Sequence, residues 1–471
     1  MTRRRAMNRR NFLLKTGAGF GAVALADLLA AASSNPLASK QPHQAAKAKA
    51  VIYLFMHGGV SHVDTFDYKP ELQKRSGQPL SVELAKTIKT SFIHDPTKAI
   101  LRGSPWEFKP GGRSGLLVSD LYPHLRERAD DLAVIRSCHS NIFDHAPAIY
   151  HVSSGSQFPG RPCLGSWVTY GLGTENQNLP AFVVMSDGST KSGPPAYSAG
   201  FLPAVYQGTV FRGGENPILH LRNPVGVTDD AQKATLDFVN QLDQRHLAAR
   251  GEDSTLEARI AAYELAYRMQ AEAPEAVDLA GESEATKKLY GIDDPKTEDF
   301  GRKCLLARRL VERGVRFIQL YSGTNVGDDW DDAHNDLIGS HVKMAGKTDK
   351  PIAGLLADLE AHGLLDSTLV IWGGEFGRTP LAQGANGRDH HPYGFSMWMA
   401  GAGVQGGRAI GATDDFGVHA AEEKVDAHDV NATILRLLGL DHERLTYLYQ
   451  GRDQSLTDVH GQGEFTAKLV S

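Results

Sequence analysis

Several short apolar runs of the sequence are each followed by histidines and acidic residues. His57 and Asp64 follow the run at 50–56, and Ser140 lies in the polar stretch 137–145. The stretch 328–336 contains Asp331 and His334, and a glycine-rich stretch at 373–391 contains Glu375, Arg378, Arg388, His390 and His391. Imidazoles suit borderline transition metals, and carboxylates suit harder cations. The mixture predicts a site for one or two divalent ions, namely zinc, manganese, iron or calcium.

Each of these stretches also has a purely structural interpretation. Gly58-Gly59 after an apolar run is typical of a turn, and the acidic stretch 328–332 could be a solvated loop. Glu375 could pair with Arg378 to hold a tight loop. The adjacent pair His390-His391 has little reason to exist for packing alone, and the spacing of three from Asp331 to His334 lets both side chains reach one ion. We therefore favour the metal site over the structural interpretations.

The elements that must position these residues alternate between strands and helices. We expect strands at 50–56, 132–136, 181–185, 315–321, 368–372 and 395–399, and helices at 120–131, from 145, at 298–313 and at 428–438. Two further helices are expected on either side of a break at 349–351, with Asp349 as an N-cap and Pro351 in the first turn. This alternation predicts an α/β fold, a doubly wound, mostly parallel sheet with helices on both faces. Ligands of such sheets bind beyond the carboxyl ends of the strands, which is where the polar stretches fall.

Composition excludes several classes of protein. The 471 residues are 41% hydrophobic and 22% charged, as in a globular protein with a sizeable core. The formal charge of −5 gives no electrostatic reason to expect a nucleic-acid partner. Three cysteines are too few for a disulfide framework and lack the spacing of a zinc ribbon. Residues 228–290 carry apolar residues at helical spacing among many charges, which predicts a helical insertion of two antiparallel helices.

The N-terminus has the pattern of a twin-arginine (Tat) export signal. Arg9-Arg10 is followed by Phe12 and two leucines, and then by a mild apolar stretch that ends in Ala30-Ala31-Ala32. That stretch is too short and too weakly apolar for a stable membrane span. We expect a signal at 1–32, a polar leader at 33–49 and a single folded domain at 50–471. The expected partner is the Tat machinery, and the expected location is the periplasm or the exterior.

With these motifs assembled, the chain resembles the Tat-exported proteins of domain-of-unknown-function family 1501, which is placed in the alkaline-phosphatase and sulfatase superfamily. The resemblance rests on residues 57–70, 373–380, 387–391 and 451–458. It implies an alkaline-phosphatase-like sheet with a one- or two-metal site at the strand ends. It also implies attack on a phosphate or sulfate ester by a metal-activated nucleophile.

The resemblance also implies roles for individual residues. His57 stands where the superfamily has its first metal-binding aspartate, Glu375 stands where an Asp-His pair is expected, and Asp331 and His334 match an Asp-x-x-His element. His390 or His391 falls at the position of the distal histidine. The nucleophile position corresponds to 139–141, which makes Ser140 the candidate. No Cys or Ser is followed by the formylglycine signature of sulfatases, so a mechanism of that kind is not expected.

The sequence thus predicts an exported, metal-dependent hydrolase of phosphate or sulfate esters. His57, Asp64, Asp331, His334, Glu375, His390 and His391 are the candidate metal ligands. Ser140 or a metal-activated water attacks, Arg378 assists catalysis, and Arg388 binds the anionic ester group. Two alternatives remain open: a non-catalytic periplasmic or surface binding protein that retains the fold, and a polar rim of histidines that binds no metal.

Overall fold

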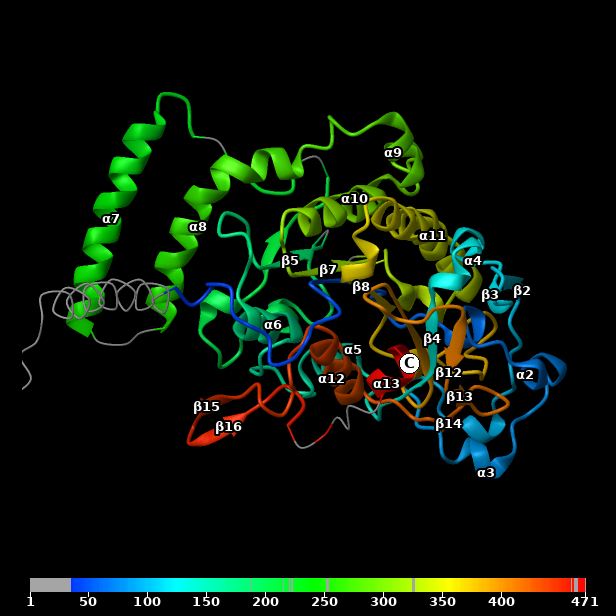
Figure 1. Cartoon of the computed structure of the whole chain (residues 1–471). Helices are drawn as coiled ribbons and strands as arrows, with labels where there is room; N and C mark the ends of the chain where they lie inside the picture. The colour runs from blue at the N-terminus through cyan, green and yellow to red at the C-terminus, as the bar shows by residue number, and fades with distance from the viewer. Residues whose placement is uncertain are drawn as a thin grey trace, which may run out of the picture.

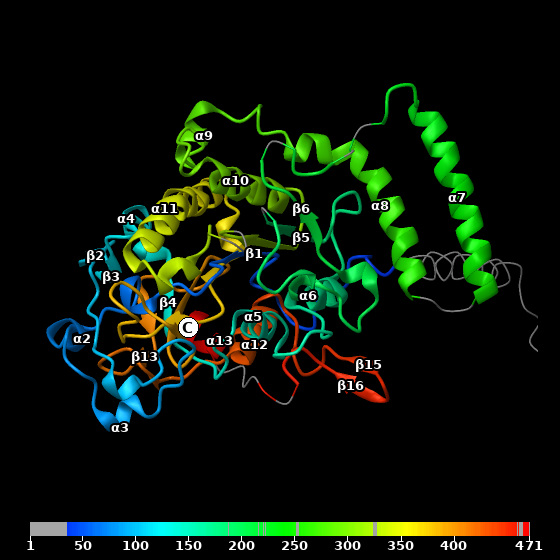
Figure 2. The ribbon, with the colours of Figure 1, turned by 180° about the vertical axis from the view of Figure 1, so that it is seen from behind.

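The computed structural model describes residues 35–470 except 187, 215, 220, 222, 251–253, 324–326, 459 and 461–464. The expected Tat signal lies outside the described residues. An eight-stranded sheet forms the centre of the molecule (Figures 1 and 2), in the order β12-β4-β11-β8-β1-β7-β5-β6. Its strands are β1 (Ala50–Phe55), β4 (Ala133–Cys138), β5 (Phe182–Met185), β6 (Thr209–Phe211), β7 (Phe317–Tyr321), β8 (Thr368–Gly373), β11 (Phe395–Ala400) and β12 (Arg408–Ile410).

Helices cover both faces of the sheet, as the sequence predicts. β1 shows why, because every residue of this strand is buried and alternate side chains enter different cores. Val51, Tyr53 and Phe55 join one core, and Ile52 and Leu54 join the other. The first core packs against α5 (His145–Ser154), α6 (Leu164–Leu172), α12 (Ala427–Leu437) and α13 (Phe465–Val470). The second packs against α4 (Pro123–Glu127), α10 (Glu298–Glu312) and α11 (Leu337–Ala361).

The sheet is mostly parallel, with one exception in its middle. β1, β7, β8 and β5 pair in parallel, whereas β11 is antiparallel to both of its neighbours, β4 and β8. The two edge strands, β6 and β12, are three residues long, and the apolar pattern does not reveal them. β6 lies inside the glycine- and proline-rich stretch 186–217, whose composition predicts a loop and not a strand.

The expected break at 349–351 is wrong, because α11 continues through Pro351. A proline inside a helix removes one backbone hydrogen bond. Met344, Ile352 and Leu355 are fully buried in the second core on either side of this point. Burial of this face stabilises the helix enough to outweigh the lost hydrogen bond.

Asp349 is therefore not the N-cap of a helix of its own. Its carboxylate accepts hydrogen bonds from the backbone N–H groups of His124 (2.9 Å) and Leu125 (2.8 Å). These N–H groups belong to the first turn of α4, where a helix lacks internal partners. Asp349 thus satisfies the N-terminus of a neighbouring helix.

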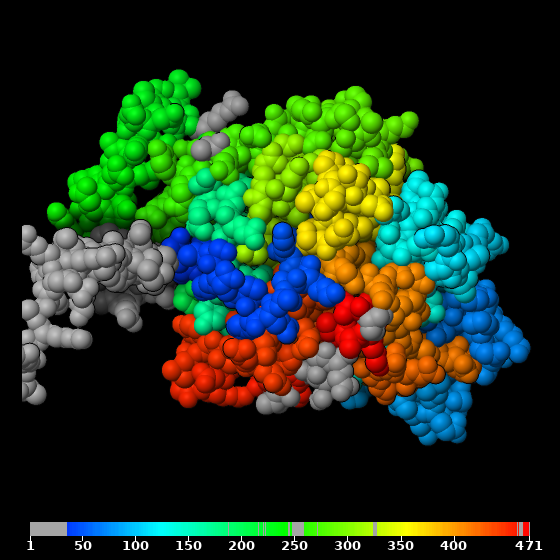
Figure 3. Space-filling model, viewed as in Figure 1, coloured from blue at the N-terminus to red at the C-terminus, as the bar shows by residue number. Residues whose placement is uncertain are grey.

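The region 228–290 projects from the body. α7 (Asp229–Arg250) and α8 (Ser254–Val277) lie side by side away from the sheet, and α9 (Glu284–Leu289) follows (Figures 1 and 2). Residues 35–49 contain no helix or strand before β1, but they lie across the surface of the body (Figure 3). Lys40 N donates to Leu172 O at 2.9 Å, and Lys47 N donates to Leu437 O at 2.8 Å. Within the described residues, no helix is long and apolar enough to cross a membrane.

Shorter elements complete the chain. They are the 3-10 turns η1 (His62–Asp64), η2 (Pro96–Lys98), η3 (Ala129–Asp131), η4 (Pro194–Tyr197), η5 (Ala204–Tyr206), η6 (Trp330–His334) and η7 (Leu365–Ser367), the helices α2 (Pro70–Lys74) and α3 (Val82–Ala85), and the hairpin pairs β2 (Phe108–Gly111) with β3 (Leu116–Ser119), β9 (Gly377–Arg378) with β10 (His390–His391), β13 (Ala412–Thr413) with β14 (Ala420–Glu422), and β15 (Tyr447–Tyr449) with β16 (Arg452–Gln454). Among these, η6 follows β7 and the β9–β10 pair follows β8. Both therefore lie near the carboxyl ends of central strands.

Candidate metal centre

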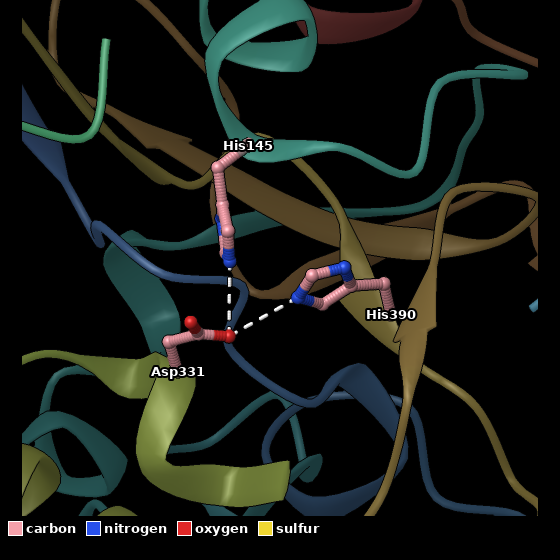
Figure 4. Close-up of side chains that lie close together, drawn as sticks. All are labelled: His145, Asp331 and His390. Carbon is pink, nitrogen blue, oxygen red and sulfur yellow. Dashed lines mark hydrogen bonds and ion pairs between the residues drawn. The ribbon is translucent and has the colours of Figure 1, made fainter. Parts of the chain in front are cut away.

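Three histidines converge on one carboxylate oxygen beyond the carboxyl ends of the strands. Oδ1 of Asp331 lies 2.9 Å from Nε2 of His145, 3.1 Å from Nε2 of His390 and 3.2 Å from Nε2 of His334. Figure 4 shows His145 and His390 pointing at Asp331 from two sides. η6 supplies Asp331 and His334, α5 supplies His145 as its first residue, and β10 supplies His390. Three segments thus supply the four ligand atoms around this oxygen. The atoms of His145, Asp331 and His390 form one group within 4.8 Å of one another, and those of His334 and His390 form a second group with Asp389.

The outer nitrogen of each ring fixes which nitrogen carries the proton. Nδ1 of His145 lies 2.6 Å from Oε1 of Glu375, Nδ1 of His390 lies 2.7 Å from the carbonyl of Phe143, and Nδ1 of His334 lies 2.6 Å from Oε1 of Gln383. All three partner oxygens are acceptors, so each Nδ1 donates its proton outward. The three Nε2 atoms, which face Oδ1 of Asp331, then carry no proton and each presents a lone pair. Histidines that bind metals are held in this way by a second layer of acceptors.

Such an arrangement is unfavourable unless a cation lies among the lone pairs. Nε2 of His145 is buried and has no hydrogen bond of acceptable geometry within the described chain, although Oδ1 of Asp331 is 2.9 Å away. Nε2 of His334 and Nε2 of His390 face each other at 2.8 Å. The three imidazole nitrogens and one carboxylate oxygen form the donor set that zinc and similar transition metals prefer. These residues therefore fit a divalent metal.

Without a metal, a proton is the other cation that could relieve this contact. Burial opposes protonation of His145, but the carboxylates of Asp331 and Glu375 outweigh burial and raise the pKa of His145. Burial lowers the pKa of His390 well below its usual range, even though Asp331 acts in the opposite direction. Burial would raise the pKa of Asp331, but the three histidines and Arg378 lower it. The carboxylate is therefore ionised and able to bind a metal at any ordinary pH.

Arg378 holds Asp331 in place. Its guanidinium is fully buried, and Nη2 donates to Oδ1 of Asp331 at 2.8 Å. Nη2 also donates to the carbonyl of Gly58 at 2.5 Å, and Nε donates to the carbonyl of Gly59 at 2.8 Å. The structure thus directs the donors of Arg378 to protein oxygens and positions this residue behind the cluster. The other oxygen of Asp331, Oδ2, forms an ion pair with Nζ of Lys191 at 2.7 Å.

Glu375 and His57 lie next to the cluster. Oε1 of Glu375 accepts from N–H of Gly58 at 3.1 Å and from His145, and the carboxylate is fully buried. Burial opposes ionisation, but the hydrogen bond and the charge of His145 lower the pKa of Glu375. Nε2 of His57 accepts from N–H of Lys191 at 3.0 Å, and burial lowers the pKa of His57 to about 4. Glu375 therefore lies behind His145 as its acceptor, and His57 is a neutral neighbour.

The glycine after His57 is required by this close packing. Gly58 has φ of +111°, and a Cβ at this position would lie 2.7 Å from N of Asp331. A larger residue would therefore displace the turn that holds Asp331. The turn predicted from Gly58-Gly59 is present and also supports the cluster.

The structure places Asp64 and Arg388 away from the cluster, where they pair with each other. Nε of Arg388 donates to Oδ2 of Asp64 at 2.8 Å, and Nη2 donates to Oδ1 at 3.2 Å. Neither side chain has any exposed surface. A buried bidentate pair of this kind cannot also receive an ester group from solvent, so these two residues have a structural role in this fold.

His391 and Ser140 also lie apart from the four converging residues. Nε2 of His391 lies 2.5 Å from the carbonyl of Val418, and its ring stacks on His62 at 5.9 Å. Oγ of Ser140 accepts from N–H of Ile142 at 3.2 Å, and Ser140 lines a separate cavity. Adjacent residues of a strand point to opposite sides, which explains why His390 joins the cluster and His391 does not.

Sequence reasoning missed His145 as a ligand. Its signal was present, because His145 ends the polar stretch after the strand at 132–136. Lys191 and Gln383 lie in loops with no motif around them, and only the fold brings them to Asp331 and His334. Phe92 is another unpredicted neighbour, since its ring contacts His334 at 4.6 Å between centroids and is 56% exposed at the rim of the cluster.

Comparison with solved structures finds similar proteins of low identity. The lipoteichoic acid synthase LtaP from Listeria monocytogenes is 10% identical with a TM-score of 0.38, over 86% of this chain and 76% of that chain. The PsFucS1 sulfatase from Pseudoalteromonas sp. is 11% identical with a TM-score of 0.35, over 90% and 73%. The TAB5 alkaline phosphatase, a mutant with Mg bound, is 10% identical with a TM-score of 0.34, over 85% and 100%. Likenesses at this level assign no activity to the chain.

Comparison with sequences gives a clearer result. A search of curated proteins finds no match. The family model described as "Protein of unknown function (DUF1501)" matches residues 48–464, which include the four residues of the cluster and the whole central sheet. The match confirms the resemblance drawn from the motifs, and the chain belongs to the DUF1501 family.

Proposed function

We propose that this protein is an exported, metal-dependent hydrolase of phosphate or sulfate esters. Its metal is held by His145, Asp331, His334 and His390. The observation that carries the proposal is a pair of overlapping groups, His145–Asp331–His390 and His334–Asp389–His390, in each of which the ligand atoms lie within 4.8 Å of one another. The outer nitrogen of each of the three histidines is bound to an acceptor. The choice of ester rests on the resemblance that places the DUF1501 family in the sulfatase and alkaline-phosphatase superfamily.

When bound, a divalent ion at this site would neutralise charge on the ester oxygens and make a water molecule more acidic. The chain contributes the surroundings. Arg378 and Lys191 fix the two oxygens of Asp331, and Glu375 keeps Nδ1 of His145 protonated. The side chains of the four ligands are between 6% and 22% exposed, so the cluster is partly open to solvent. The exposed ring of Phe92 lies against His334 and His390 and offers an apolar surface to the group that carries the ester.

We assign the nucleophile to water instead of Ser140. The backbone of Ser140 lies close to the segment of His390, because N–H of Ser140 donates to the carbonyl of Pro392 at 2.8 Å. Its hydroxyl, however, accepts from N–H of Ile142 at 3.2 Å, and Ser140 lines a separate cavity. In the described part of the chain, no hydrogen bond joins Ser140 to the four ligands. A water molecule needs no protein side chain at the position of attack.

A second function is favoured by one specific observation. Both arginines that could hold an anionic ester, Arg378 and Arg388, are fully buried and bound to protein oxygens. A protein that kept the fold and the metal but lost its anion-binding arginine would bind a ligand without turning it over. We therefore retain a non-catalytic metal-binding protein as the alternative.

Hydrolysis assays on the metal-loaded full chain distinguish the two. The substrates are 4-nitrophenyl phosphate, bis(4-nitrophenyl) phosphate and 4-nitrophenyl sulfate, each with zinc and with manganese. The test variant is His145→Gln, and the matched control is His391→Gln, a buried histidine outside the cluster. The hydrolase proposal predicts turnover in the wild type and in the control but not in His145→Gln. Metal bound without turnover of any of the three esters would support the non-catalytic alternative.

Export is the second part of the proposal. It is supported by Arg9-Arg10 and the small residues at 30–32. A Tat substrate folds in the cytoplasm, where its metal can be inserted before export.

A further inference from the structure

A second group of histidines surrounds a cavity of about 500 Å³ near the end of α5. Its lining includes His139, Asn141, His151, Phe158, His428 and His460. We propose that this cavity binds an oxyanion, namely a phosphate, sulfate or carboxylate group. This site is separate from the metal centre, and the inference does not depend on the proposed hydrolase activity.

Different segments bring these histidines together. His139 and Asn141 follow β4, His151 lies on α5 two turns after the metal ligand of that helix, and His428 is the second residue of α12. The ring of His428 lies between two others, with centroids 5.2 Å from His151 and 4.8 Å from His460. Clusters of imidazoles are costly when protonated and contribute little to an apolar core. Their shared exposure to one cavity therefore indicates a ligand.

The donor geometry favours an anion over a metal. Among the described residues, the groups of three ligand atoms that could share one ion lie only at the metal centre, not in this cavity. Nε2 of His428 is 3.0 Å from the carbonyl of Gly155, and Nδ1 is 3.5 Å from Oδ1 of Asp426. Both nitrogens of His428 are thus directed at oxygens as donors. The rings of His139 and His460 make no hydrogen bond within the described chain, so their N–H groups can bind a ligand oxygen.

An acidic residue, Asp426, also lines the cavity, and its carboxylate is held by neighbouring groups of the chain. Asp426 accepts from backbone N–H of His428 (2.7 Å) and of Asp429 (3.0 Å) at the start of α12. Although burial opposes protonation, the hydrogen bond and the charge of Asp426 raise the pKa of His428. The carboxylate of Asp426 is therefore compensated by its own partners.

Two of the other histidines, His151 and His139, have lowered pKa values. Burial, followed by repulsion from His428, lowers the pKa of His151 to about 4; Asp426 opposes this shift and His460 adds to it. Burial also lowers the pKa of His139, with Asp426 and Asp429 opposing it and Lys424 adding to it. An anion placed among these rings would reverse the repulsion and favour the imidazolium form. Binding of an oxyanion should thus take up a proton.

The oxyanion could be a free ion or a substituent of a sugar. Phe158 lines the cavity and is 67% exposed, which leaves its ring face open beside the histidines. An exposed aromatic ring can stack on the apolar face of a sugar whose anionic group enters the cavity. Inorganic phosphate and glucose 6-phosphate separate the two sources, because only the second can use Phe158.

Isothermal titration calorimetry of the metal-loaded full chain tests the inference. Inorganic phosphate and glucose 6-phosphate are titrated at about pH 5.5 and about pH 8, in buffers with different ionisation enthalpies that report proton uptake. His145→Gln removes phosphate binding at the metal centre, and His151→Gln and His139→Gln alter the cavity. His246→Gln, on the exposed side of α7, is the control.

Inorganic sulfate keeps the same charge at both pH values and is titrated beside phosphate. We expect it to bind about tenfold more tightly at the lower pH, with proton uptake, as an upward shift of one unit in the pKa of a cavity histidine would give. This binding should persist in His145→Gln and in the control, and should fall in both cavity variants. Because one variant could lose binding through a change in its fold, the loss must be seen in both His151→Gln and His139→Gln. Phosphate binding that is lost in His145→Gln, or that is unchanged in His151→Gln and His139→Gln, would overturn the inference, as would the absence of binding. Stronger binding of glucose 6-phosphate that Phe158→Ala removes would identify a sugar-linked anion.

Discussion

Variants of the buried pair Asp64–Arg388 test whether Asp64 stabilises the fold or binds the metal. Arg388 donates two hydrogen bonds to Asp64, at 2.8 and 3.2 Å, and further bonds to the carbonyls of Thr379 and Gly103. Asp64 also accepts from Oγ of Ser61 at 2.5 Å. Neither partner is exposed, so Asp64→Asn leaves a buried guanidinium without its counter-charge. Breaking such a pair costs about 3–5 kcal/mol of the free energy of unfolding.

The double variant Asp64→Leu/Arg388→Met should recover much of that loss. Replacing a buried ion pair by apolar residues of similar size is often neutral, because the desolvation penalty of both charges is removed. Urea unfolding gives the free energies, and elemental analysis gives the metal content of the same samples. We expect Asp64→Asn to lose stability while its folded fraction keeps a full complement of metal. Loss of metal with unchanged stability would refute the reasoning and return Asp64 to the ligand set.

Three further predictions concern other parts of the chain. Burial raises the pKa of Asp349 from 3.8 to about 6. The folded protein therefore binds this proton more tightly than the unfolded chain, and the protonated carboxyl contributes to the free energy of unfolding below pH 3.8. This contribution is lost as the pH rises through about 6. Asp349→Asn should remove about 3 kcal/mol of this dependence in urea unfolding at several pH values, and an unchanged profile would contradict the shift. A Cβ at Gly387 would lie 1.8 Å from the carbonyl oxygen of His334. Gly387→Ala should therefore weaken metal affinity by about 10- to 100-fold in a competition titration. The control Gly346→Ala should leave the affinity unchanged, because a Cβ there has no atom within 4 Å. Replacing the arginine pair at 9–10 by two lysines should hold the protein in the cytoplasm on fractionation, and undiminished export would exclude a Tat signal.

The fold was predictable where local pattern and burial agree. The run at 50–56 is apolar throughout because β1 is buried on both faces, and its sequence alone indicates a central strand. Pro351 misleads because its local preference is outweighed by packing of α11 in the core, which no local window contains. The antiparallel direction of β11 is equally invisible, since both directions bury the same apolar run.

The sequence predicted the type of candidate site, a metal centre of histidines and carboxylates, better than it predicted the individual ligand residues. Asp331, His334 and His390 were expected as ligands and do converge. Asp64 carries the same ligand chemistry, but only the fold shows that Arg388 takes up its charge. His145 was passed over because it lies seven residues beyond its strand, and the start of α5 brings it back to the strand ends. Residue type thus indicates the chemistry, whereas the partner that each side chain meets is decided by tertiary structure.

In the proposed site, His145 completes the metal ligands together with Asp331, His334 and His390. Elemental analysis of protein purified without added metal tests this role of His145 in the wild type, in His145→Gln and in the control His391→Gln. We predict a bound transition metal in the wild type and in the control, and its loss in His145→Gln with the fold retained by circular dichroism. Full metal content in His145→Gln, or no metal in the wild type even after incubation with zinc, would contradict the account.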